Sequence, residues 1–241
     1  MPGPVQKSTG RLIGEGGVVV FSILIAFGVD AWWEYRGERV RERESIEQLV
    51  DEFVAIDAEL AQLDSLYTLA NSGEQRLKVL MAAMGSRQGD FPDLTLDSLI
   101  AGAIGNPRAS LPEGVLASLL ASGDLSLIRS DRLRAALAGW APERSKVEDD
   151  LIGASEFTSD FLMPYLWGEV SVRAIDVKTG YHEELGPGPF DHDPWQLLVD
   201  RRFENLINER LILVETNAER AREARAHAQT VLRLARAELS R

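Results

Sequence analysis

The longest uncharged stretch of this chain constrains its fold most, because Gly16–Val29 lies directly between Glu15 and Asp30. A bilayer core of about 30 Å needs about 20 helical residues at 1.5 Å each, so this stretch alone covers only about 21 Å. Extending it to Leu12–Trp33 gives about 33 Å and moves both carboxylates away from the midplane, where a charge is most costly. The sequence therefore predicts a transmembrane helix over residues 12–33, after a short N-terminal tail over residues 1–11.

The residues on both flanks of this run agree with a membrane span. Lys7 and Arg11 precede it, and aromatic side chains follow it where an interfacial belt is expected. The residues predicted to lie at the membrane interfaces are Glu15, Asp30, Trp32, Trp33 and Tyr35. Small residues in the same segment would allow close packing against another membrane helix, and these are Gly10, Gly14, Ser22 and Ala26.

Two other structures fit the same run less well. A removable signal sequence also has a basic start and a short apolar stretch, but Val29-Asp30-Ala31 is a poor cleavage site and two tryptophans follow it. A core helix of a soluble domain is less favoured still, because Val18–Ile25 is apolar on every side. A retained anchor is the preferred interpretation.

The orientation of the span rests on two opposing cues. Four arginines at positions 36, 39, 41 and 43 follow the span, against Lys7 and Arg11 before it, which favours a cytoplasmic body. Each of these arginines is offset by a neighbouring glutamate, and a short tail before a long trailing domain is typical of a signal anchor. We therefore expect a single-pass protein of the bacterial inner membrane, with its main domain on the periplasmic, exoplasmic side.

A heptad pattern follows the aromatic belt and predicts a membrane-proximal long helix over residues 34–71. Its apolar positions alternate at spacings of three and four, and they are Ile46, Leu49, Phe53, Ile56, Leu60, Leu63, Tyr67 and Ala70. No proline interrupts the chain between Val5 and Pro92, so the span should continue directly into this helix.

Residues 72–241 are predicted to form a helical bundle domain. Ser72 with Gln75, Ser110 with Glu113, and Asp131 have the pattern of helix N-termini. The segment 168–194 shows a brief β-like alternation and then many Gly and Pro residues, so we expect one long irregular loop there. Asp193-Pro194 should start a last helix to about Leu239. The predicted fold class is all-α, with the transmembrane helix running into an extramembrane bundle of antiparallel helices.

Two stretches resemble a family of uncharacterised bacterial single-pass membrane proteins, the DUF6090 family. The first has Gly14-Glu15, then Ile23-Leu24-Ile25-Ala26-Phe27, then Asp30-Ala31-Trp32-Trp33-Glu34. The second, Leu116–Trp140, is similar to that family's pattern of small residues, Gly-Asp-Leu, Leu-Ile and Leu-Arg. The chain departs from the family at Asp30 and Trp32, where Asn is more usual. The resemblance implies a membrane anchor with a helical domain and no assigned activity.

Composition and motifs narrow the chemistry. The formal net charge of -12, with no basic stripe, argues against nucleic-acid binding, and the lack of cysteine excludes disulfides and thiol chemistry. The sequence contains no nucleotide-binding, nucleophile-elbow or zinc-protease motif, and no cofactor is predicted. His182, Asp191 and His192 are weak candidates for a metal site, although a solvated loop is the simpler interpretation. His227 is expected on a helix surface.

Three functions fit these observations, in decreasing order of preference. The first is a non-enzymatic structural or accessory subunit of a larger bacterial membrane protein assembly, which contacts the lipid bilayer and binds other membrane-protein subunits or self-associates through the Ile46–Ala70 seam. The second is an exoplasmic helical sensor or ligand-binding module that signals through a partner. The third is a membrane-bound enzyme with an unrecognised site in the 168–194 loop.

Overall fold

The computed structural model describes residues 9–68, 72–88, 90 and 95–241, and the side chains of residues 9–20, 22 and 23 are not among those described. The described residues form helices and no β-strand, which confirms the all-α prediction. The α-helices are α1 (Thr9–Thr68), α2 (Gly73–Ala82), α3 (Leu96–Ile104), α4 (Gly114–Ser122), α5 (Asp131–Phe157), α6 (Met163–Glu169), α7 (Val172–Lys178) and α8 (Arg201–Leu239). A π-helical turn, η2 (Thr158–Leu162), joins α5 to α6, and the short 3-10 helices are η1 (Asp124–Leu127), η3 (Glu183–Leu185) and η4 (Pro194–Val199).

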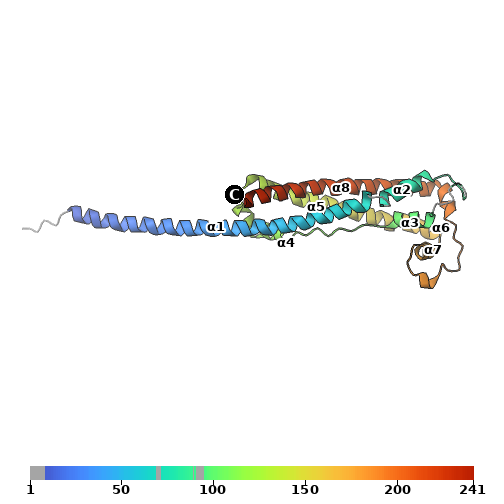
Figure 1. Cartoon of the computed structure of the whole chain (residues 1–241), viewed down its shortest axis with the longest axis horizontal. Helices are drawn as coiled ribbons and strands as arrows, with labels where there is room; N and C mark the ends of the chain where they lie inside the picture. Colours follow the sequence, from blue (N-terminus) through green and yellow to red (C-terminus); the bar gives the residue numbers. More distant parts are fainter. Residues whose placement is uncertain (1–8, 69–71, 89, 91–94) are drawn as a thin grey trace, which may run out of the picture.

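Three long helices set the shape of the molecule. The second half of α1 and the whole of α5 run in one direction, and α8 returns between them in the opposite direction (Figure 1). The shorter helices α3, α6 and α7 gather at the far end of this bundle. The first half of α1 continues alone past the other end, where the C-terminus lies (Figure 1). The prediction of a long helix packed in an antiparallel bundle is therefore confirmed.

The heptad seam of α1 lies along the centre of the hydrophobic core. Its seven described members from Ile46 to Tyr67 are buried, while Ala70 lies outside the described residues. They pack against α8, which offers a row of alanines at spacings of three and four. Small side chains let the helix axes approach closely, so α8 fits between α1 and α5. The described part of the seam is therefore used for packing inside the chain.

The helix starts show where local signals were sufficient. Ser72 caps α2 by accepting the N–H of Gln75, as predicted. The cap of α5 is Ser130, which accepts the N–H of Leu133, so the assignment of Asp131 as the cap was wrong by one residue.

The start of α4 departs further from the prediction. The helix begins at Gly114 rather than after Ser110. The carboxylate of Glu52 on α1 accepts the N–H groups of Val115 at 2.8 Å and Leu116 at 3.0 Å. A distant side chain thus satisfies the free donors of this helix end and favours the local dipole, which a sequence pattern around Ser110 does not indicate.

The segment 168–194 is not one long irregular loop. It contains α7, which Ser171 caps through the N–H of Ala174, and whose Ala174 and Ile175 are buried. Alternating valines suggested a strand, but seven residues are too few for periodicity to distinguish the two structures.

The last helix also differs from its prediction. Asp193 and Pro194 start only the 3-10 helix η4, and Asp200 then caps α8, which begins at Arg201.

The predicted span Leu12–Trp33 is described only in part. Among the residues that the structure describes, no helix has a stretch long and apolar enough to cross a membrane. The side chains of Gly10, Gly14, Glu15 and Ser22 lie outside the described ones. The backbone of α1 is continuous from Thr9 to Thr68, as expected from the absence of proline.

Candidate functional site

The described residues of the protruding part of α1 expose apolar side chains on every side. Residues 24–33 are all exposed, and Phe21 and Phe27 retain 65% and 67% of their surface accessible. Trp32 and Trp33 follow, with ring centroids 5.4 Å apart in an edge-on arrangement. Asp30 and Tyr35 are exposed on the same helix, and so is Ala26, a predicted packing residue. Asp30, Trp32, Trp33 and Tyr35, the described members of the predicted interface set, thus surround α1, and we refer to them as the collar.

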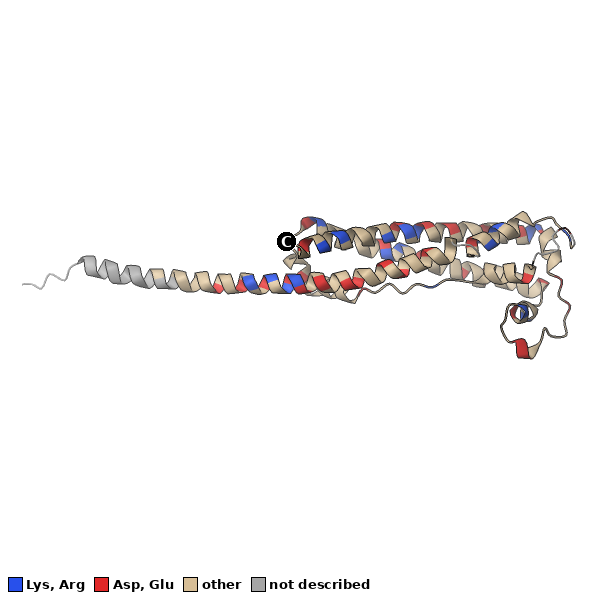
Figure 2. Ribbon diagram, viewed as in Figure 1, with Lys and Arg blue, Asp and Glu red and all other residues tan. Residues whose placement is uncertain are grey.

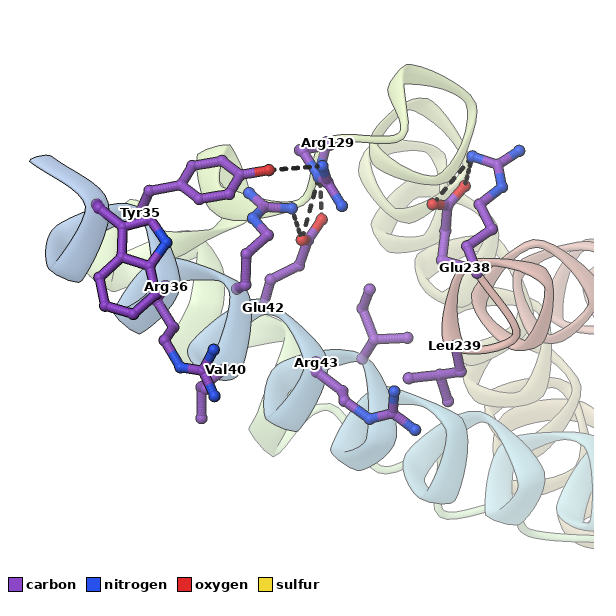
Figure 3. Close-up of a pocket in the computed structure, with 12 residues that line it drawn as sticks. Tyr35, Arg36, Val40, Glu42, Arg43, Arg129, Glu238 and Leu239 are labelled. Carbon is purple, nitrogen blue, oxygen red and sulfur yellow. Dashed lines mark hydrogen bonds and ion pairs between the residues drawn. The ribbon is translucent and has the colours of Figure 1, made fainter.

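A cavity of about 460 Å³ lies where this collar meets the bundle, and we refer to it as the arginine cavity. Its walls come from α1, from the segment before α5, and from the end of α8 (Figure 3). Trp32, Tyr35, Val40, Ile46 and Leu239 supply its apolar surface. Its charged residues are Arg36, Arg39, Glu42, Arg43, Arg129, Glu238 and Arg241.

Glu42 organises one wall of the arginine cavity. Its carboxylate is buried and accepts the backbone N–H of Arg129 at 2.7 Å. The Arg129 guanidinium lies 3.4 Å from Glu42 and donates to the Tyr35 hydroxyl at 3.4 Å, and Arg39 also pairs with Glu42 (Figure 3). These contacts hold the connection before α5 against α1. They also keep two guanidinium groups beside the cavity, where a single carboxylate serves both.

Aromatic side chains of α1 contact two of the cavity's arginines. The Arg36 guanidinium lies over the Trp32 ring, 5.8 Å from its centroid, and Arg39 lies 5.3 Å from the centroid of Tyr35. Such cation–π contacts keep an arginine in place without neutralising its charge. Five arginines and two glutamates therefore line the cavity in a chain whose net charge is -12. Figure 2 shows arginines interleaved with acidic residues on α1 where it joins the bundle.

The residues proposed as weak metal ligands do not converge. His192 is mostly buried, and its Nε2 lies 2.5 Å from a carboxylate oxygen of Asp97, which Lys178 also contacts at 2.8 Å. His182 is exposed, 3.5 Å from Glu184, and Asp191 is exposed as well. Within the described part of the chain, no three His, Cys, Asp or Glu side chains are grouped to hold a metal ion. The loop places His192 in an ion-pair cluster instead.

His227 is not a plain surface residue. Its Nε2 lies 2.7 Å from the carbonyl oxygen of Ala136, so this nitrogen carries the proton and donates, and the ring lies beside Trp140. The contact joins α8 to α5, which explains why the side chain is half-buried. The sequence around His227 is rich in alanine and arginine and indicates only a helix.

Sequence reasoning found the collar but missed the cavity. The density of arginines over residues 36–43 is the sequence signal that marks this surface, although for a predicted span it indicates only an orientation. Arg129, Glu238 and Arg241 come from segments far along the chain, and no local pattern associates them with residues 32–46.

Comparisons of the chain with protein-family models find no match, and comparisons with curated proteins and with solved structures find none either. The resemblance to the DUF6090 family stays a prediction.

Proposed function

We propose that this chain is a non-enzymatic, single-pass membrane protein of the bacterial inner membrane that serves as an accessory subunit of a larger membrane protein assembly. The observation that carries the proposal is the apolar, fully exposed part of α1. Burying side chains such as Phe21, Leu24, Ile25, Phe27 and Val29 is worth about 1.5–3 kcal/mol each. A helix that leaves them all in water forgoes on the order of 10 kcal/mol, so another phase or protein should cover it.

A bilayer fits this helix better than a single protein partner does. A partner that packs on one side selects an apolar stripe, whereas this segment is apolar around its circumference. The tryptophans and Tyr35 then occupy the positions of an interfacial belt, followed within one or two turns by arginines. The small residue Ala26 would leave room for a neighbouring membrane helix.

The body supports an accessory role because its buried polar groups are used to hold helices together. Glu52 caps α4, Arg210 joins α8 to α3 and α5, and Asn217 on α8 donates to the hydroxyl of Tyr67 on α1 at 3.1 Å. These contacts make a stiff support for a membrane helix. We place the body on the exoplasmic side of the membrane.

Membrane attachment should depend on the apolar part of α1. We expect the wild-type chain to stay in the membrane pellet after alkaline carbonate washing, and Leu24→Arg/Phe27→Arg to enter the supernatant. Each arginine near the centre of a span costs about 2.5–3.5 kcal/mol. The matched control is Val54→Arg/Leu66→Arg, on an exposed face of α1 inside the bundle, which should remain in the pellet. A wild-type chain that carbonate extracts completely would contradict the anchor.

The same membranes report the orientation. Because the chain has no cysteine, Glu184→Cys introduces a single thiol on an exposed part of the body. A membrane-impermeant maleimide should label it in intact spheroplasts. Labelling only after lysis would place the body in the cytoplasm.

The accessory role predicts a stable partner. In mild detergent, the full-length chain should co-elute with one or more membrane proteins at a constant ratio. Ala26→Leu should lower that ratio several-fold by filling the small-residue face. Ala31→Leu is the control, because five residues along a helix turn the side chain about 140° away. Mass spectrometry of the eluate gives the ratio. A solitary monomer, or equal loss in both variants, would count against the role.

A further inference from the structure

We propose that the arginine cavity binds the phosphate group of an anionic lipid headgroup. The inference rests on the proposed membrane anchor, because the anchor is what would bring the cavity to a bilayer surface. It adds a ligand class and a binding site to that function.

The arginine cavity directly borders the exposed apolar part of α1. Trp32 belongs both to the collar and to the cavity wall. Arg36 comes three residues after Trp33, about 4.5 Å further along the helix. The polar headgroup layer on each side of a bilayer is roughly 5–7 Å thick, from the difference between its total and hydrocarbon thickness. Ile25 and Val29 are exposed and lie eleven and seven residues before Arg36, so they share its helix face. A lipid whose chains lie along these two side chains would thus place its phosphate beside Arg36.

The residues that line the arginine cavity carry an excess of positive charge. Five arginines face two glutamates there, and the surplus stands out because the whole chain is acidic. Arginine presents five N–H donors in a planar fork that matches phosphate oxygens, so it binds phosphate with geometric specificity as well as charge. Glu42 and Glu238, together with Glu47, which pairs with Arg43 at 3.0 Å on the exposed surface, engage only part of this donor set. A phosphate diester would supply the missing acceptors.

Two donors in the cavity have no acceptor among the described residues. The Nε of Arg39 is buried and makes no hydrogen bond there, and a buried N–H without a partner is unfavourable because it has lost its hydration. Arg36 has a described contact to the Trp32 ring but no described carboxylate partner. Both side chains belong to the half of the cavity nearer the collar. One buried donor without an acceptor, on Arg39, and one exposed guanidinium, on Arg36, thus lie where a headgroup would arrive.

The size of the cavity suits a small ligand rather than a folded partner. Its volume of about 460 Å³ falls within the range of small-molecule sites. The apolar side chains on its rim, Trp32, Val40 and Leu239, would contact the glycerol and the first methylenes of a lipid. An acidic peptide would satisfy the arginines equally well, but it would not explain why the cavity borders an apolar helix.

The test measures lipid occupancy directly. The full-length chain in mild detergent is mixed with equal amounts of phosphatidylglycerol or phosphatidylcholine, and native mass spectrometry counts bound lipids. Both lipids carry a phosphodiester, but only the first has a net negative charge. We expect occupancy by phosphatidylglycerol to exceed that by phosphatidylcholine. Arg36→Gln/Arg43→Gln should reduce this preference by about tenfold or more, at roughly 1 kcal/mol for each basic residue near an anionic surface.

A matched control distinguishes an effect of the cavity's arginines from an effect of the total charge at this end of the bundle. Arg41→Gln/Arg132→Gln removes the same charge from exposed arginines near the same end of the bundle that do not line the cavity. It should keep the wild-type preference. Equal loss in both double variants, or equal binding of the two lipids by the wild type, would overturn the proposal. Inorganic phosphate that binds as tightly as phosphatidylglycerol, or an acidic peptide that displaces it from the same arginines with higher affinity, would overturn the lipid as the ligand.

The outcome is independent of the anchor test. Carbonate extraction reports whether α1 is embedded in a membrane, whereas lipid counting in detergent reports only on the arginine cavity. A chain that stays in the pellet but shows no lipid preference keeps the proposed function and loses the headgroup site. A chain that carbonate extracts loses the anchor, whichever lipid it binds.

Discussion

Replacing Arg210 by methionine should lower the free energy of unfolding by about 2–4 kcal/mol. The side chain is 1% exposed, and burial lowers the pKa of its guanidinium because the charged form loses hydration. Its donors go to the carbonyl oxygens of Ala103, Gly105 and Ala154 and to the side-chain oxygen of Asn106. Methionine has a similar length but donates no hydrogen bond, so the carbonyl oxygens of Ala103 and Gly105 lose the Arg210 donor, whereas Ala154 and Asn106 keep the hydroxyl of Thr158.

Thermal unfolding followed by circular dichroism in mild detergent checks this expectation. At about 2–4 °C for each kcal/mol in a chain of this size, Arg210→Met should unfold roughly 5–15 °C lower. Arg210→Lys should lose nearly as much, because one ammonium group cannot reach four acceptors on three segments. Arg233→Met, at an exposed position of the same helix, should shift the midpoint by less than about 2 °C. A stable Arg210→Met variant would mean that dehydration of the charge outweighs its hydrogen bonds.

Truncating Trp140 to alanine should cost about 3–5 kcal/mol, the range for large aromatic side chains in a core. Trp140 belongs to α5, is 1% exposed, and lies edge-on to Phe53 of α1 with ring centroids 5.4 Å apart. Its other neighbour is His227 of α8. One side chain therefore contacts all three long helices, and a cavity at this point loosens each pair of them.

A second variant separates the volume of Trp140 from its polar atom. The indole N–H is buried and has no acceptor among the described residues. Trp140→Phe removes that unsatisfied donor along with part of the volume, so it should lose only about 1–2 kcal/mol. Trp167→Ala is the matched control, because that side chain is 65% exposed. If Trp140→Ala unfolds at the same temperature as Trp167→Ala, the three-helix contact is not a main source of stability.

The parts of the fold that followed from the sequence are those with a long repeated signal. The α1 seam runs over more than three heptads, so its burial could be predicted residue by residue. A local cap was also informative, since Ser72 starts α2 as its spacing from Gln75 predicts. The short helix α7 was not predicted, because seven residues are too few to show the 3.6-residue period of a helix.

The features that the sequence did not predict depend on contacts between distant segments. Glu52 replaces a local cap at α4, and Arg210 is a charged residue in a core position that hydropathy alone would exclude. The arginine cavity has the same origin. Its α1 half is a visible run of basic and aromatic residues, but its other half arrives through the antiparallel return of α8 and the bend before α5.

The continuity of α1 also fixes the rotation of the bundle about the axis of this helix. Helix α1 packs against α8 from Ile46 onward and is unbroken between Trp32 and this point. Its exposed part therefore has a fixed rotation, as well as a fixed distance, relative to the bundle. One residue inserted between Gly37 and Val40 would turn the body about 100° around the helix axis, and four would turn it about 400°, nearly back to its starting phase. The number of residues between the exposed part of α1 and the bundle therefore sets which side of the bundle faces a given side of that helix. A partner that contacts both the helix and the bundle, as the proposed function requires, would fit only one of these rotational positions.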